Sequence, residues 1–201
     1  MSNPEHVEVV RRGADAIEVW RARNPGVVLN LEGADLRGEN LDDANLERAS
    51  LIGARLEGAY MRRVILIHAK LDIAQLSLAN LRLGDFRWAD ARGANFSSAN
   101  LQEADFHKAA LQGVSFEGAD LQSTNLADAN LEGAVLSRAK FGRTKLLNTN
   151  FTSAKGLETV EHSADSEVGE GTLNSSIKLP LVFVRGCGIE LSEEEVRKYT
   201  Y

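Results

Sequence analysis

Apolar residues recur at every fifth position of this 201-residue chain, from Leu31 to Phe151. All 25 of these centres are apolar, and every one except Ala91 is Leu, Phe or Met. The residue two places before the centre is Ala in 17 of 24 cases. A five-residue period rotates around an α-helix, and it does not match the two-residue alternation of a flat strand. The period instead predicts a solenoid in which each pentad forms one short side and then turns a corner.

A second period, of twenty residues, sets the size of one turn. Gly lies two residues after the centre at positions 33, 53, 93, 113 and 133, and the series has one miss, at Ile73. Four pentads therefore complete a turn, and the glycines indicate corners that need a positive φ or a close backbone approach. The 25 pentads predict about six turns, which at a strand spacing of roughly 4.8 Å gives a length of about 30 Å.

The repeated pentad carries a family resemblance. Ala44-Asn45-Leu46-Glu47-Arg48 and its neighbours resemble the pentapeptide-repeat family over residues 29–157. The resemblance implies an all-β fold, a right-handed quadrilateral parallel β-helix with the central Leu or Phe and the preceding Ala pointing inward. It implies no reaction, because the family shares a shape and not a chemistry. The predicted organisation is an N-terminal α-helical cap over 1–28, the β-helix over 29–157, an acidic flexible linker over 158–177, and a C-terminal strand and short helix over 178–201.

Composition narrows the class of protein further. With 43% hydrophobic but only 6% aromatic residues, the chain can fill a long, narrow core of Leu and Ala. The sequence has no run of about eighteen apolar residues, and its N-terminus is polar and charged, so we expect neither a membrane span nor a signal peptide. The single Cys187 excludes an internal disulfide and fits a reducing compartment. We therefore expect a cytoplasmic protein, and the family resemblance implies a bacterial one.

The spacing of the phenylalanines predicts how the core is filled. Phe86 and Phe106 lie one turn apart on one side, and Phe96 and Phe116 lie one turn apart on the next, so each pair is expected to stack ring over ring. Ala91 lies between them and offsets its large neighbours at native packing density. The residues singled out as structural core are Leu36, Leu46, Leu56, Leu71, Phe86, Phe96, Phe106, Phe116, Leu131 and Phe141.

The residues before the repeats predict a cap, because a solenoid end exposes unpaired backbone groups and an apolar cross-section. Residues 4–23 are interpreted as one amphipathic helix with four apolar residues on one face: Val10, Ala14, Ile17 and Trp20. The end of this stretch also resembles the leader that precedes the repeats in many bacterial pentapeptide proteins. A membrane-surface helix is the alternative, but four acidic and four basic residues before position 28 disfavour it.

The composition changes after Leu157. Residues 158–176 are acidic and rich in Gly, Ser and Thr, which is typical of a loose linker. Residues 179–184 are apolar and β-prone, and Ser192 with Glu195 forms a capping box that predicts a short helix. Residues 183–189 are similar to the junction that joins pentapeptide repeats to a Toll/interleukin-receptor-like domain in a group of bacterial proteins. The segment either caps the solenoid or leads into a further domain of a defence or signalling protein.

No residue pattern predicts catalysis or a metal site. The four histidines are scattered, and the sequence contains no metal-binding, nucleophile or phosphate-loop motif. His68 and His107 share a face but lie two turns, about 10 Å, apart, which is too far to share a metal directly. Cys187 beside Arg185 is interpreted as a small buried residue in preference to a reactive thiol. We therefore expect no enzyme activity, catalytic residue, cofactor or metal.

The family resemblance raises one specific alternative, mimicry of DNA. Pentapeptide proteins associated with quinolone resistance bind DNA gyrase, and their acidic rods are held to stand in for duplex phosphates. Here residues 29–157 carry 16 acidic and 15 basic residues, so the rod is almost neutral. Its charge is banded, with six acids and two bases in 29–53, four and seven in 54–93, six and one in 94–133, and none and five in 134–157. These bands disfavour both gyrase mimicry and nucleic-acid binding.

Four successive outward positions depart from the repeat because they are large and apolar. The set that we call the apolar belt comprises Ile73, Leu78, Leu83 and Trp88, together with the nearby Tyr60, Ile65 and Ile67. Exposed apolar patches usually mark contacts with partners. The candidate polar rim of this surface comprises Arg62, Arg63, Arg82 and Arg87. The alternative is that the belt covers corners of its own turn or lies beneath a folded-back tail.

These patterns predict a non-catalytic scaffold for protein–protein interaction, with an unidentified protein as partner. A homodimer through the C-terminal segment or the apolar belt is one form that this interaction can take. Two other functions stay as alternatives, a DNA-mimic binder of gyrase or another topoisomerase and a purely structural spacer. The charge bands argue against the first of these functions, and the apolar belt argues against the second.

Overall fold

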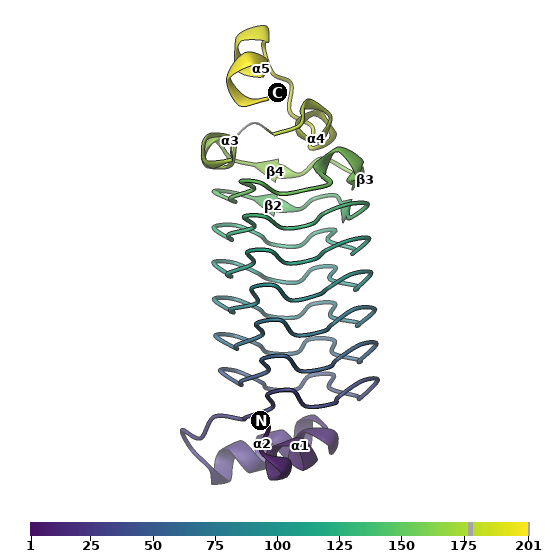
Figure 1. The fold of residues 1–201 in the computed structure, drawn as a ribbon, viewed down its shortest axis with the longest axis vertical. Coiled ribbons are helices and arrows are strands. Elements are labelled where there is room, and N and C mark those ends of the chain that lie inside the picture. The colour runs from purple at the N-terminus through teal and green to yellow at the C-terminus, as the bar shows by residue number, and fades with distance from the viewer. Residues whose placement is uncertain (177–178, 201) are drawn as a thin grey trace.

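The computed structural model describes residues 1–176 and 179–200 and shows a rod with helices at both ends (Figure 1). The residue before each repeat centre pairs in parallel with the residue twenty positions later, from Asn30 with Ser50 to Val135 with Lys155. Each turn of the rod therefore contains twenty residues, as the glycine spacing predicts. Four pentads form the four sides of one turn, and equivalent sides of successive turns stack along the rod.

All corners of the rod have the same left-handed backbone. The residue two places after the centre has a φ between 54° and 68° at every position from Gly33 to Ser153. In this conformation its N–H points along the rod and donates to the next turn, as from Ile73 N to Arg92 O at 2.9 Å. Gly occupies only eight corners, and the other seventeen carry a side chain. The glycines thus identify the corner geometry, but inter-turn hydrogen bonds enforce it where Gly is absent.

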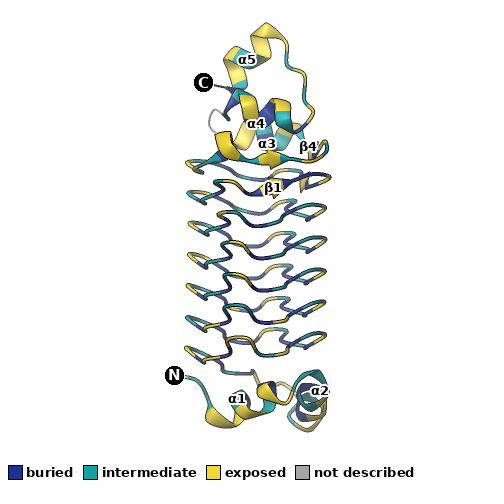
Figure 2. Cartoon of the chain, turned by 90° about the vertical axis from the view of Figure 1, so that its right-hand side faces the viewer, coloured by how far each residue is buried: buried dark blue, intermediate teal, exposed yellow. Residues whose placement is uncertain are grey.

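The residues at the repeat centres are buried, while most outward residues are half-buried or exposed (Figure 2). The ten residues singled out as core have no exposed surface. Phe86 and Phe106 stack with ring centroids 4.4 Å apart, and Phe96 and Phe116 stack at 5.3 Å, as their spacing predicts. Gly84 replaces the usual inward Ala because a Cβ there would lie 2.8 Å from Phe86 Cε2.

Three buried threonines take the inward position of Ala toward the C-terminal end of the rod. The hydroxyls of Thr124, Thr144 and Thr149 donate to main-chain carbonyls of the preceding turn at distances of 2.8–3.0 Å. These hydrogen bonds satisfy the only polar atom of each side chain, so the threonines are tolerated inside an apolar core.

Two helices cover the N-terminal end of the rod, α1 (Pro4–Arg11) and α2 (Ala14–Arg23). The prediction of one continuous helix over residues 4–23 is wrong, because Gly13 adopts a φ of 87° and breaks it. Val10, Ile17 and Trp20 are nonetheless buried against the first turn. Gly13 allows the two helices to bend around the end of the rod, so that both contribute apolar residues to the core.

Polar side chains of these helices satisfy the open backbone edge of the first turn. Arg21 donates to the carbonyls of Asn45 at 2.7 Å and Glu47 at 2.6 Å, and Arg11 donates to the carbonyl of Asp35 at 3.0 Å. His6 Nδ1 accepts from the N–H of Asn30 at 2.9 Å. The helices therefore pair backbone groups that would otherwise form an exposed β edge.

The C-terminal end continues the coil for a partial turn. Strand β1 (Lys140–Phe141) pairs with β3 (Glu161–His162), and β2 (Lys145–Leu146) pairs with β4 (Glu167–Val168). A short 3₁₀ helix, η1 (Leu157–Thr159), precedes β3, and α3 (Glu170–Ser175) follows β4. The prediction of a loose linker is therefore wrong for residues 158–176. A few apolar side chains anchor this acidic segment to the core, namely Leu157, Val160 and Val168.

Helix α4 (Leu181–Gly186) lies across the end of the core, where the sequence predicts a strand, and α5 (Glu193–Tyr199) follows. The ring of Phe183 contacts those of Phe141, Phe151 and His162 at centroid distances of 5.6–5.9 Å. Contact with these three rings explains why the apolar run forms a helix that caps the rod and not an isolated strand. The capping box at the start of α5 is confirmed. The predicted boundary at 177–178 and the last residue, 201, lie outside the described residues.

The C-terminal cap contains a histidine in an apolar setting. Both ring nitrogens of His162 are buried without a hydrogen-bond partner among the described residues, and the ring faces Phe141 and Phe183. Burial lowers the pKa of His162 from its ordinary value of 6.5 because the charged form loses hydration. The folded chain therefore favours the neutral form of this imidazole.

We predict that acid weakens this cap. As the pH falls through 6.5, the unfolded chain binds a proton at His162 before the folded chain does, so the free energy of unfolding decreases until the lowered pKa is passed. Thermal denaturation between about pH 8 and pH 5 measures the effect. His162→Leu should lose that part of the pH dependence, and an unchanged profile in this variant would refute the assignment.

A second prediction concerns Ala91, which is fully buried between the phenylalanine stacks. Ala91→Leu should destabilise the rod by about 1–3 kcal/mol, because the added methyl groups overpack the core. Chemical denaturation measures the change, with Ala110→Leu on the outer surface as the matched control. A midpoint for Ala91→Leu equal to that of the wild type would contradict this view of the core.

Candidate protein interaction surface

The structure places large apolar side chains of the belt on the outside of the rod. The exposed fractions are 60% for Ile73, 70% for Leu78, 37% for Leu83, 42% for Trp88 and 57% for Tyr60. Ile65 and Ile67 are half-buried. No segment of the described chain covers the five exposed residues, so the idea of a folded-back tail over the belt does not hold for that part of the chain.

The square cross-section divides the belt among different sides of the rod. Ile73, Leu78, Leu83 and Trp88 occupy four successive corners of one turn. One flat partner cannot contact all four corners at once. The side between the corners of Leu83 and Trp88 is the richest, because it also carries Ile65 and Ile67 on the turn below. We call this region the Trp88 side.

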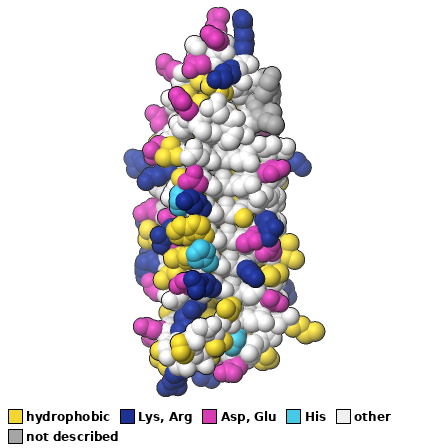
Figure 3. All heavy atoms as spheres, turned by 90° about the vertical axis from the view of Figure 1, so that its left-hand side faces the viewer, with side chains coloured by type: hydrophobic (Ala, Val, Ile, Leu, Met, Phe, Trp, Pro, Cys, Tyr) yellow, Lys and Arg dark blue, Asp and Glu magenta, His cyan; other side chains and the backbone are white. Residues whose placement is uncertain are grey.

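Two histidines that the belt prediction omitted flank the indole of Trp88. His68 stacks on Trp88 with ring centroids 5.3 Å apart and an interplanar angle of 20°, and His107 meets it edge to face at 6.0 Å. Hydrophobic and histidine side chains gather about halfway up the rod in Figure 3. His68 and His107 lie about two turns apart in the sequence, with the outward Trp88 between them. This spacing was the sequence signal that could have predicted the cluster.

The arginines of the predicted rim differ in their electrostatic state. Arg87 forms a two-pronged ion pair with Asp85 at 2.7–2.8 Å, and its guanidinium carbon lies 5.7 Å from the centroid of the Trp88 ring. The hydrogen bond and charge of Asp85 raise the pKa of Arg87. Arg63 pairs with Asp43 at 2.6 Å, and Arg82 pairs with Glu103. Arg62 alone among the four lacks an acidic partner among the described residues. Three of the rim charges are therefore already compensated.

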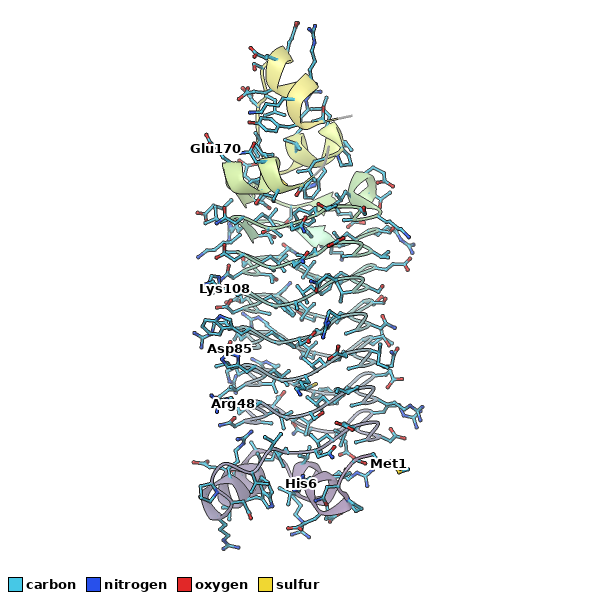
Figure 4. All side chains as sticks on the ribbon, turned by 60° about the vertical axis from the view of Figure 1, so that its left-hand side comes forward. Met1, His6, Arg48, Asp85, Lys108 and Glu170 are labelled. Carbon is cyan, nitrogen blue, oxygen red and sulfur yellow. The ribbon has the colours of Figure 1, made fainter. Side chains whose placement is uncertain are left out.

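Charged groups continue along the edge that carries Trp88. Arg48, Asp85 and Lys108 project from the same side of the rod (Figure 4). Arg48 lies 3.6 Å from Glu47, and Nδ1 of His107 lies 3.6 Å from Asp128. This mixture of apolar and compensated polar groups resembles a protein-binding surface, which has an apolar centre and a polar margin.

The belt corners share the left-handed backbone of every other corner, but they combine it with large apolar side chains. Ile73, Leu78, Leu83 and Trp88 have φ values of 54–63°. A left-handed backbone is unfavourable for residues with a Cβ by about 1–2 kcal/mol, and a β-branched residue such as Ile73 is a clear outlier there. The side chain of Ile73 lies over the neighbouring glycine corners, and its Cγ2 is 3.4 Å from where a Cβ on Gly93 would lie. This contact offsets a small part of the strain.

Three other features of the described residues bear on chemistry: the thiol of Cys187, the arrangement of metal-binding side chains and a cavity beside Arg185. Burial raises the pKa of the Cys187 thiol to about 12, assisted by the charge of Asp165, so this thiol stays protonated at neutral pH. In the described residues, no three His, Cys, Asp or Glu side chains are placed to bind a metal ion. A shallow cavity of about 650 Å³ beside Arg185 and Asp165 is open to solvent. None of the helices in the described ranges is long and apolar enough to cross a membrane.

Fold and surface together define a class of protein, a parallel β-solenoid built from five-residue repeats. The family model described as pentapeptide repeats (8 copies) matches five overlapping segments that together span residues 30–152. The chain therefore belongs to the pentapeptide-repeat family. The fold of this family is the right-handed quadrilateral β-helix, and the family is generally non-catalytic.

Solved structures of the same family resemble the chain. HetL from the cyanobacterium Nostoc sp. strain PCC 7120, a protein involved in regulating heterocyst differentiation, is 28% identical with a TM-score of 0.40, covering 75% of this chain and 73% of HetL. Rfr23 from the cyanobacterium Cyanothece 51142 is 21% identical with a TM-score of 0.45, covering 78% and 100%. QnrB1, a plasmid-mediated fluoroquinolone resistance protein, is 20% identical with a TM-score of 0.33, covering 85% and 94%. No curated protein shows significant sequence similarity to the chain.

The corner strain leads to a prediction at Ile73. Ile73→Gly should give a rod more stable than Ile73→Ala by about 1 kcal/mol, because only Gly relieves the left-handed strain while both variants remove the exposed side chain. Chemical denaturation of the two variants and the wild type measures this difference. If Ile73→Ala proves as stable as Ile73→Gly, strain at this corner is negligible and the argument fails.

Proposed function

We propose that this protein is a non-catalytic scaffold that binds a protein partner through the Trp88 side. The observation that carries the proposal is the pair of consecutive strained corners at Leu83 and Trp88, both large, apolar and exposed. These side chains add little to the stability of the core, and Gly would relieve the strain at both positions. An exposed apolar group kept in a strained conformation is typical of a binding surface.

The composition of the Trp88 side supports a protein as partner. Trp and Arg are enriched among residues that dominate protein–protein binding energy, and here Arg87 lies against the ring of Trp88. The Arg87 charge is already compensated by Asp85, so burial at an interface would not leave an isolated cation. A purely structural spacer would have no need for this arrangement.

The DNA-mimic alternative finds less support in the charge of the rod. A duplex presents phosphates at regular intervals along its whole length. In this chain the acidic stretches 29–53 and 94–133 alternate with the basic stretches 54–93 and 134–157. A gyrase surface that binds DNA would therefore meet repulsion over about half of this rod.

The similarity at residues 183–189 extends the proposal to a larger assembly. In the described structure these residues belong to α4 and the loop after it, with Phe183, Val184 and Cys187 buried at the end of the rod. We propose that this cap fixes the direction in which a Toll/interleukin-receptor-like module would follow the rod. The rod would then supply recognition for a bacterial defence or signalling protein.

A paired substitution tests the binding surface. Leu83→Glu with Trp88→Glu should weaken binding of a protein partner by about tenfold or more, because charged groups replace both apolar anchors. The partner is first isolated by affinity capture on the wild-type protein from its native cells, then purified and titrated against each variant. Self-association is measured in parallel.

The control is Ser98→Glu with Ser123→Glu, which adds the same charge at two exposed corners outside the belt. We expect it to bind as the wild type does, and both variants to keep the β-type circular dichroism. Equal affinity for both paired variants would overturn the proposal. Loss of the fold in Leu83→Glu with Trp88→Glu would show instead that these side chains belong to the core.

A further inference from the structure

One side of the rod concentrates most of the charge banding. Its rows are centred on Leu41, Met61, Leu81, Leu101, Leu121 and Phe141, and parallel pairing from Asn40 to Lys140 stacks them in this order. In each row the outward residues are the one before the centre and the two after it. Their net charges in the six rows are −2, +2, +1, −1, −1 and +2, in this order. On the other three sides no row exceeds one net charge. We call this face the charged side.

The order of these charges is antisymmetric about the middle of the rod. The third row is positive where the fourth is negative, the second is positive where the fifth is negative, and the first is negative where the sixth is positive. A twofold axis perpendicular to the rod, midway between the rows of Leu81 and Leu101, exchanges these row pairs in two facing copies. Every row of one copy then meets a row of opposite charge.

Ion pairs within the chain use only part of this charge. Asp43 pairs with Arg63, and Arg82 pairs with Glu103. Among the described residues, the carboxylates of Asp42 and Asp120 and the cations of Arg62, Lys140 and Arg143 form no ion pair. Asp120 instead accepts hydrogen bonds from the amide groups of Gln102 and Gln122, at 2.8 and 3.2 Å.

The groups left without an ion pair follow the same antisymmetric order. Arg62 is in the second row and Asp120 in the fifth, while Asp42 is in the first row and Lys140 and Arg143 are in the sixth. The internal pairs therefore leave complementary charges at equal distances from the middle of the side. In two facing copies Arg62 would meet the fifth row of the partner, and Asp42 would meet its sixth row.

We propose that the charged side binds a second copy of this chain in an antiparallel, twofold-symmetric dimer. Such an interface is self-complementary, as twofold symmetry requires. A parallel arrangement would set each row against its own copy, so that like charges meet in all six rows. Tyr60 and Leu83 add apolar contact on this side, with exposed fractions of 57% and 37%.

The dimensions of the charged side set the strength of the dimer. Six rows at about 4.8 Å and a width of one pentad give a face of roughly 25 by 15 Å, or about 400 Å². A stable interface buries about 800 Å² per partner, so the dimer is weak and depends on electrostatic attraction. Its formation should decrease between about 0.01 M and 0.15 M salt, as the Debye length falls from about 30 Å to about 8 Å.

A charge exchange tests both the contact and its direction. Arg62→Glu and Asp120→Arg should each weaken the dimer by about tenfold, because each sets like charges against one another across the twofold axis. The double variant with both changes should recover the wild-type dimer, since row two meets row five only in the antiparallel arrangement. Sedimentation velocity of the full chain at low salt measures the dimer fraction over a concentration series.

Two controls separate this proposal from a structural effect and from the Trp88 side. Lys108→Glu reverses one exposed charge on another side and should leave the dimer fraction unchanged, and so should Trp88→Glu. Thermal midpoints identify any variant that is destabilised, in which case Arg62→Gln and Asp120→Asn replace the reversals. A wild-type chain that stays monomeric at low salt, or a folded double variant that does not recover, would overturn the proposal.

Discussion

The structure depends on one backbone constraint, a left-handed corner every five residues that directs its N–H toward the next turn. This hydrogen bond fixes the turn at twenty residues and brings the apolar centres of successive turns into register. It holds even where the corner residue is Ile, Leu or Trp, so the sum of many inter-turn bonds and buried centres outweighs the local strain. The corner side chain is consequently free to vary, and any function of the rod must be carried by these outward positions.

The two ends show how such a repeat is terminated. At the first turn, His6, Arg11 and Arg21 satisfy backbone groups that have no preceding turn. At the last turn, the hydroxyls of Thr172 and Ser176 accept from the N–H groups of Thr149 and Phe151 at 2.9 and 3.0 Å. Both caps thus combine side-chain hydrogen bonds with an apolar lid, although the first uses two arginines and a histidine and the second uses short hydroxyls.

Much of the fold could be predicted from the sequence, because the period of five determines both which residues are buried and where each corner lies. The stacking of Phe86 on Phe106 followed directly from a spacing of one turn. The caps were harder to predict, because a single Gly13 divides one amphipathic pattern into two helices. The helix around Phe183 was not predicted, because the rings on which it packs, those of Phe141 and Phe151, are distant from it in sequence.

The candidate site was predictable in composition and less so in geometry. The apolar corners stood out from the repeat, and four pentads per turn already predict that they lie on four different corners of a square tube. Trp88 was identified without its neighbours His68 and His107, because residues twenty positions apart become adjacent only through inter-turn pairing. The family match fixes the architecture over residues 30–152 and leaves the partner to be inferred from the surface.

The change of register in the final coil has a consequence for growth of the rod. Lys140 pairs with Glu161 and Lys145 with Glu167, offsets of 21 and 22 residues where the earlier turns keep twenty. The terminal rung is therefore no longer a template for the first rung of another molecule. We expect this altered register, together with the helical lids, to oppose end-to-end polymerisation into a filament, so that a chain made of self-similar units forms a particle of finite length.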